Sequence, residues 1–188
     1  MSRNPSTAKK AGSEFEQRVA DYLATVLGDD RIERRAKHGS KDVGDIAGVR
    51  IPEGKVVIEC KNYLQPQVWM PLREAEAERM NDKAAIGVAV VKVPCIGWAH
   101  MGLQCAAVRK EDFDRLFYGE RAFPVGAFHC SKMRDLMLCG PRYSEVTSRK
   151  DGPRAVLMTL RTFAAWVIGG EEYLCEEEVI GDKKEESE

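Results

Sequence analysis

The fold is decided by residues 44–61, which read GDIAGVRIPEGKVVIECK. Residues 43–49 have the apolar, β-branched character of a strand, and residues 55–61 form a second apolar run of the same kind. The segment between them, 52–54, reads Pro-Glu-Gly, a combination typical of a tight turn. The stretch therefore predicts two neighbouring strands joined as a hairpin.

Helices and strands alternate around this hairpin. Upstream, Ser13 and Glu16 have the spacing of a capping box, so we expect a helix to begin at Ser13 and end at Gly28. Downstream, a helix is expected at 71–82, and the apolar run 85–93 is typical of a central strand. Further strands are expected at 98–103 and 155–160, and further helices at 111–118 and 162–167. This order predicts an α/β (α+β) domain around a mixed sheet.

Charge is distributed unevenly along the 188 residues, although the net charge is −1. Residues 171–188 carry nine acidic residues against two lysines, whereas residues 1–170 carry 27 Lys and Arg against 21 Asp and Glu. A basic body with an acidic tail favours a protein that binds a polyanion. We divide the chain into a flexible basic arm, a core domain, a basic C-terminal extension packed on the core and an acidic tail, at 1–11, 12–118, 119–170 and 171–188.

Several protein classes are disfavoured by composition. The sequence has no run of about 18 apolar residues, so we expect no membrane span. The N-terminal residues lack the apolar stretch of a signal peptide, and the six cysteines include no C-x-x-C pair. We therefore expect a cytoplasmic protein with reduced thiols.

Chemistry is concentrated in the hairpin. Glu59 and Lys61 are two residues apart on one strand and share a face, while Cys60 points to the other side. The hairpin can bring Asp45 beside Glu59, and two carboxylates at one place repel each other unless a cation lies between them. Mg²⁺ or Mn²⁺ is the natural cation for such oxygen ligands, and Lys61 could activate water or stabilise a phosphoryl transition state. The alternative is an ordinary amphipathic hairpin with a solvated Glu-Lys pair.

The same residues resemble the signature of the PD-(D/E)XK nuclease superfamily, as Asp45 followed by Glu59-x-Lys61. The wider pattern is similar to archaeal-type Holliday junction resolvases and their bacteriophage relatives over about residues 10–105. It comprises Gly12-Ser13-x-x-Glu16, Gly39-Ser40-Lys41, Ile86-Gly87-Val88-Ala89-Val90 and Gly97-Trp98. The resemblance implies a restriction-endonuclease-like mixed central sheet flanked by helices. It also implies a homodimer that binds four-way DNA junctions and nicks them with Mg²⁺, in recombination or replication, and in the host cytoplasm for a phage protein.

The resemblance also implies roles for individual residues. Glu16, Asp45 and Glu59 would be metal-site carboxylates and Lys61 the catalytic lysine, with Ser40 near the scissile phosphate. Cys60 is assigned to the metal site with them. The spacing from the Ser40 loop is one residue longer than the pattern, which leaves Asp42 as an alternative to Asp45. Glu16 has an alternative of its own, since a capping-box glutamate needs no metal.

DNA contacts are expected from basic residues close to this site. The expected contact residues are Lys9, Lys10, Arg34, Arg35, Lys37 and Lys41, and the segment 121–161 is a second candidate surface. The leading hypothesis is a structure-selective DNA endonuclease. The alternatives are a nuclease of the same core that acts on linear or modified duplex DNA, and a non-catalytic DNA-binding replication accessory protein.

Overall fold

The computed structural model describes residues 4–35, 43–117, 143–148 and 152–169. Three residues expected at the DNA or the scissile phosphate, Lys37, Ser40 and Lys41, lie outside these ranges, as do Asp42 and the acidic tail at 171–188.

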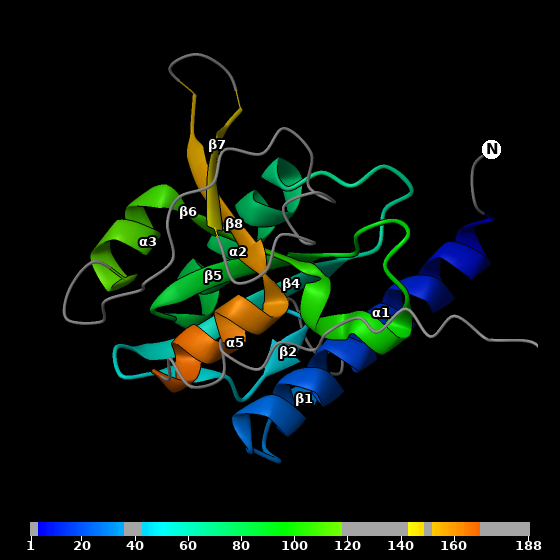
Figure 1. Cartoon of the computed structure of the whole chain (residues 1–188), viewed down its shortest axis with the longest axis horizontal. Helices are drawn as coiled ribbons and strands as arrows, with labels where there is room; N and C mark the ends of the chain where they lie inside the picture. The colour runs from blue at the N-terminus through cyan, green and yellow to red at the C-terminus, as the bar shows by residue number, and fades with distance from the viewer. Residues whose placement is uncertain (1–3, 36–42, 118–142, 149–151, 170–188) are drawn as a thin grey trace, which may run out of the picture.

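The described chain forms a mixed α/β fold around an open eight-stranded sheet (Figure 1). Its strands are β1 (Glu33–Arg34), β2 (Ile46–Ala47), β3 (Arg50–Ile51), β4 (Gly54–Lys61), β5 (Ile86–Val91), β6 (Cys105–Arg109), β7 (Tyr143–Thr147) and β8 (Arg154–Thr159). They lie in the order β1-β2-β4-β5-β6-β8-β7, and β3 pairs with β4 beside this path. The pair β4–β5 is parallel, and the other pairings among the described strands are antiparallel. The expected mixed sheet is confirmed.

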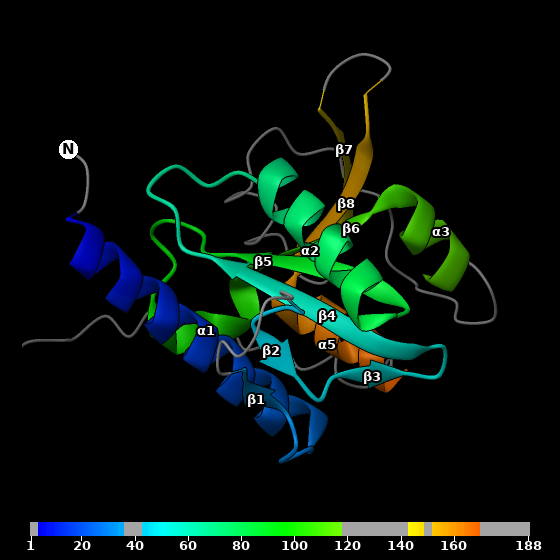
Figure 2. The ribbon, with the colours of Figure 1, turned by 180° about the vertical axis from the view of Figure 1, so that it is seen from behind.

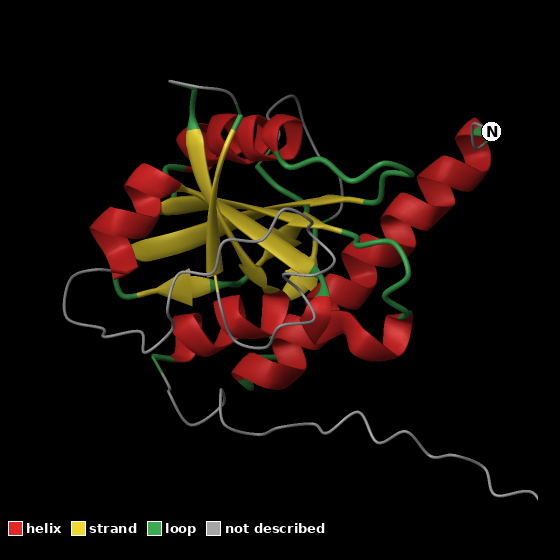
Figure 3. Ribbon diagram, turned by 45° about the horizontal axis from the view of Figure 1, so that its top comes forward, coloured by secondary structure: helices red, strands yellow, loops and turns green. Residues whose placement is uncertain are grey.

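Helices cover both faces of the sheet (Figure 3). They are α1 (Pro5–Leu27), α2 (Trp69–Asp82), α3 (Lys110–Phe117) and α5 (Leu160–Ile168), with a 3-10 segment η1 (Trp98–Leu103). Helix α2 lies against β4 and β5 on one face, whereas α5 lies on the opposite face (Figure 2). The middle of β4 is therefore enclosed on both sides, and Glu59 on this strand is buried.

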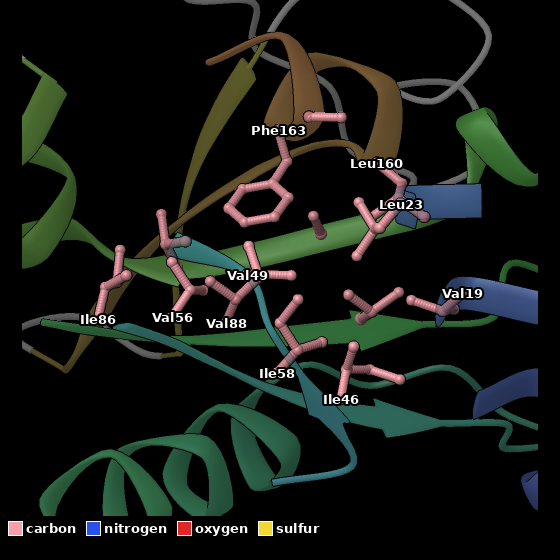
Figure 4. Packing of buried hydrophobic residues seen from close by; sticks show 14 of the residues in the cluster. Val19, Leu23, Ile46, Val49, Val56, Ile58, Ile86, Val88, Leu160 and Phe163 are labelled. Atoms are coloured by element: carbon pink, nitrogen blue, oxygen red, sulfur yellow. The ribbon is translucent and has the colours of Figure 1, made fainter. Parts of the chain in front are cut away.

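The larger hydrophobic core lies between the sheet and the layer of α1 and α5. Val19 and Leu23 of α1 meet Ile58 of β4, and Leu160 and Phe163 of α5 pack over the same strands (Figure 4). Burying an apolar side chain of this size contributes about 1.5–3 kcal/mol. This packing fixes β4 and so fixes the residues at its end.

Helix α1 begins earlier than the sequence predicts. Asn4 caps the helix by accepting a hydrogen bond from the backbone N–H of Ser6 at 3.2 Å, and Pro5 occupies the first turn, where its missing N–H costs nothing. The predicted capping box at Ser13 is wrong, because Ser13 lies inside the helix and its hydroxyl accepts from Arg34 at 3.2 Å. Residues 5–11, expected as a flexible arm, are helical and project beyond the sheet (Figure 1).

The strand predicted at 98–103 is also wrong. This segment is the 3-10 segment η1, whose backbone is kinked at His100, and the strand follows it at β6. Trp98 holds the segment against α1, because the centroid of its ring lies 6.2 Å from the ring centroid of Phe15. The contact with α1 outweighs the local β-propensity.

The described parts of 119–170 belong to the sheet and its core. Strand β8 pairs with β6, β7 pairs with β8, and Phe163 and Trp166 of α5 are buried in the main core. The strand expected at 155–160 and the helix at 162–167 are confirmed as β8 and α5. Across the described residues, no helix combines the length and apolarity that crossing a membrane requires.

Candidate functional site

Asp45 is held at the start of β2 by the backbone on both sides. Its N–H donates to the carbonyl of Ile58 at 2.8 Å, and its carbonyl accepts from the N–H of Arg35 at 2.7 Å. Gly44 before it has a φ of 92°, and a Cβ there would lie 2.8 Å from a methyl carbon of Val57. A glycine is therefore needed to turn the chain onto β4, and the turn places Asp45 next to that strand.

The Asp45 carboxylate reaches across to β4. Its Oδ2 accepts a hydrogen bond from the backbone N–H of Cys60 at 2.9 Å, and the residue is 8 % exposed. The antiparallel pairing Ile46 with Ile58 sets this register. The prediction that the hairpin brings Asp45 to the Glu59-x-Lys61 segment is therefore confirmed.

Glu59 and Lys61 point to the same side of β4, as the alternation of the strand predicts. The Lys61 ammonium forms an ion pair with the Glu59 carboxylate and a second one with Glu74 of α2, at 2.9 Å. Glu59 is 4 % exposed, while the Lys61 side chain keeps a quarter of its surface in contact with solvent. Lys61 is therefore the more exposed and Glu59 the more buried member of the pair.

The electrostatics of the site reflect crowding of negative charge. Burial, followed by repulsion from Asp45 and Glu78, raises the pKa of Glu59, and the ion pair with Lys61 opposes this rise. Burial lowers the pKa of Lys61, but its pairs with Glu59 and Glu74 outweigh burial, so that this pKa lies above its usual value. The lysine therefore stays charged, and Glu59 is costly to ionise unless more positive charge arrives.

Glu16 and Cys60 are placed differently from the other expected metal ligands. Glu16 accepts from Arg34 Nε at 2.7 Å and so has an ion-pair partner of its own. The Cys60 thiol packs in the core on the face of the sheet away from Glu59, and burial and then Asp45 raise its pKa. The Cys60 side chain is thus a neutral core residue, and its backbone N–H is the part that touches the site.

The basic residues expected at DNA fall into two groups. Arg34 pairs with Glu16, and Arg35 pairs with Asp82 at 3.1 Å, so both guanidinium groups hold elements of this fold together. Lys9 and Lys10 instead lie exposed on the projecting turns of α1. The lysines are therefore better placed than the two arginines to meet a ligand.

Helix α2 contributes two residues that sequence reasoning missed. Glu74 contacts Lys61, and Glu78, one turn later, is 4 % exposed and contributes to the raised pKa of Glu59. Their spacing is the sequence signal that could have found them, because acidic residues four apart share a face of a helix. In the structure, Leu72 and Ala75 are buried on this side of α2. Which strand that face meets depends on tertiary packing.

The chemistry of the donor set fits one hard divalent cation. Within the described ranges, no three His, Cys, Asp or Glu side chains converge as a metal cluster. Asp45 and Glu59 nevertheless form a buried pair of carboxyl groups. Mg²⁺ in enzymes is commonly held by one or two carboxylates, with water and substrate phosphate completing the shell. Asp45 and Glu59 are thus the two residues that would hold it.

Comparison of the chain with family models, with curated proteins and with solved structures finds no match.

Proposed function

We propose that this protein is a Mg²⁺- or Mn²⁺-dependent DNA endonuclease that resembles the PD-(D/E)XK nucleases and acts on four-way or otherwise branched DNA. The observation that carries the proposal is the buried carboxylate pair Asp45 and Glu59 with Lys61 on the face of Glu59. The open mixed sheet flanked by helices is compatible with a restriction-endonuclease-like fold. A homodimer is part of the proposal, because a four-way junction offers two equivalent strands.

The chain's own residues have distinct tasks in this reaction. Asp45 and Glu59 would hold the cation through their carboxylate oxygens, and the cation would supply positive charge next to the scissile phosphate. Lys61 stays protonated and stabilises the extra negative charge on the phosphoryl oxygens. Water adds to phosphorus and releases a proton to solvent, one P–O bond to the sugar breaks, and the leaving oxygen takes up a proton from solvent.

The test is a nicking assay with a synthetic four-way junction and a linear duplex of the same sequence, each with Mg²⁺ and with chelator. The proposal predicts cation-dependent cleavage that favours the junction. Equal cleavage of both substrates would assign the protein to linear duplex DNA instead. Tight DNA binding without cleavage, at any Mg²⁺ or Mn²⁺ concentration, would favour a non-catalytic replication accessory protein.

A further inference from the structure

Lys61 contacts two carboxylates that come from different elements. Glu59 lies on β4 and is 4 % exposed, whereas Glu74 lies on α2 and its side chain is 40 % exposed. In the proposed nuclease, Glu59 has two competing uses, because the same carboxylate pairs with Lys61 and would bind the cation. A cation on Glu59 repels the ammonium, so Lys61 needs another acceptor if it is to remain at the site.

Glu74 is held in reach of Lys61 by close packing of α2 on the sheet. A Cβ at Gly87 of β5 would lie 2.6 Å from the carbonyl oxygen of Ala75, the residue after Glu74. The helix backbone therefore rests directly on the glycine, and β5 is in parallel register with β4, which pairs Lys61 with Val91. The backbone positions from which Glu74 and Lys61 extend are thus set by the packing of α2 on the sheet and by the β4–β5 register.

We propose that Glu74 is a positioning residue, which retains the Lys61 ammonium when Glu59 gives its carboxylate to a divalent cation. The inference rests on the proposed function and names a residue outside the Asp-Glu-x-Lys motif. With a neutral residue at position 74, cation binding leaves Lys61 without its carboxylate partner on α2, so Lys61 competes with the cation for Glu59. Removing Glu74 should therefore weaken cation binding through Lys61.

The test is Mn²⁺ binding by calorimetry to the full chain without DNA. Four proteins form a double-mutant cycle: wild type, Glu74→Gln, Lys61→Met and the double variant. The matched control is Glu76→Gln, which removes the same charge from the same helix but pairs with Arg79 and Arg109. Thermal melts verify that each variant is folded. We expect Glu74→Gln to fold, because the Glu74 side chain is 40 % exposed.

We expect Glu74→Gln to weaken Mn²⁺ binding about fivefold in the wild-type background, a typical coupling between linked sites. In the Lys61→Met background the same change should have less than about a twofold effect, because only remote charge is lost. Equal effects in both backgrounds, or no effect beyond that of Glu76→Gln, would overturn the inference and leave the proposed nuclease intact. Absence of Mn²⁺ binding by the wild type would instead overturn the proposed metal centre, and this inference with it.

Discussion

Glu59 is buried beside a second carboxylate, and its ionisation links the stability of the protein to pH. The pKa of this group is raised from 4.5 to about 9, with burial as the largest cause and Asp45 next. The unfolded chain therefore releases the Glu59 proton at lower pH than the folded chain does. Stability from this group is full below the unfolded pKa and is lost as pH rises toward the folded pKa.

We predict that Glu59→Gln stabilises the cation-free protein increasingly as pH rises from 4.5 to about 9. A neutral amide avoids the cost of a buried charge, and each kcal/mol gained shifts Tm by about 2–4 °C for a chain of this size. The measurement is Tm against pH in chelator for the wild type and the variant. A difference in Tm that is constant across this range would contradict the burial argument.

The geometry of a strand is enough to predict which side chains share a face, but it does not predict which residues of other elements they contact. Period-two alternation is enough to place Glu59 and Lys61 together and Cys60 on the opposite face. The contact of Lys61 with Glu74 and the pairing of Arg34 with Glu16 join separate elements. Such contacts depend on how helices dock, and that docking is not encoded within either segment alone.

At the scale of elements, buried β-branched runs are more reliable signals than local caps. Strands β4 and β5 lie where the apolar runs predict them, because both are packed on two faces. The start of α1 is mispredicted because two capping signals compete, and the Asn4-Pro5 pair forms the actual cap. The segment at Trp98 is mispredicted because its ring packs against α1.

The seating of α2 on β5 gives a prediction at this scale. Gly87→Ala should destabilise the protein by about 1–3 kcal/mol, because the new methyl group forces the α2 backbone away from the sheet. Gly97→Ala is the matched control, since a Cβ at Gly97 has nothing within 4 Å and its φ of −72° suits alanine. Urea unfolding of the three proteins measures the difference, and equal midpoints would show that α2 is not seated on Gly87.

At the scale of the whole molecule, the described basic residues that are expected at DNA divide into two arginines that form ion pairs between elements and two lysines that lie exposed on α1. Arg34 connects β1 to α1, and Arg35 connects the end of β1 to Asp82 at the end of α2. The projecting turns of α1 carry Lys9 and Lys10 away from the sheet (Figure 1). The sequence shows all of these charges, but their partners follow only from the fold.

We therefore predict that two double variants differ in the salt dependence of DNA binding. Replacing Lys9 and Lys10 with alanine should reduce the slope of log K against log salt by about two, because each lost phosphate contact releases one fewer counterion. Replacing Arg34 and Arg35 with alanine should lower Tm and leave the slope nearly unchanged. Fluorescence anisotropy with a four-way junction measures the slope, and a slope that responds to the arginines alone would reverse the assignment.

The account as a whole depends on Lys61 acting in catalysis beside the Asp45–Glu59 pair. The most direct measurement is the single-turnover nicking rate of a four-way junction in Mg²⁺ for the wild type, Lys61→Met and Lys55→Met. Lys55 is the matched control, because it lies on β4 and forms its own ion pair with Asp82 at 2.8 Å. We predict a loss of at least about 100-fold for Lys61→Met, the scale of a lost charge-stabilising group, and a change of less than about twofold for Lys55→Met. A folded Lys61→Met protein that nicks the junction within a few-fold of the wild-type rate would contradict the account.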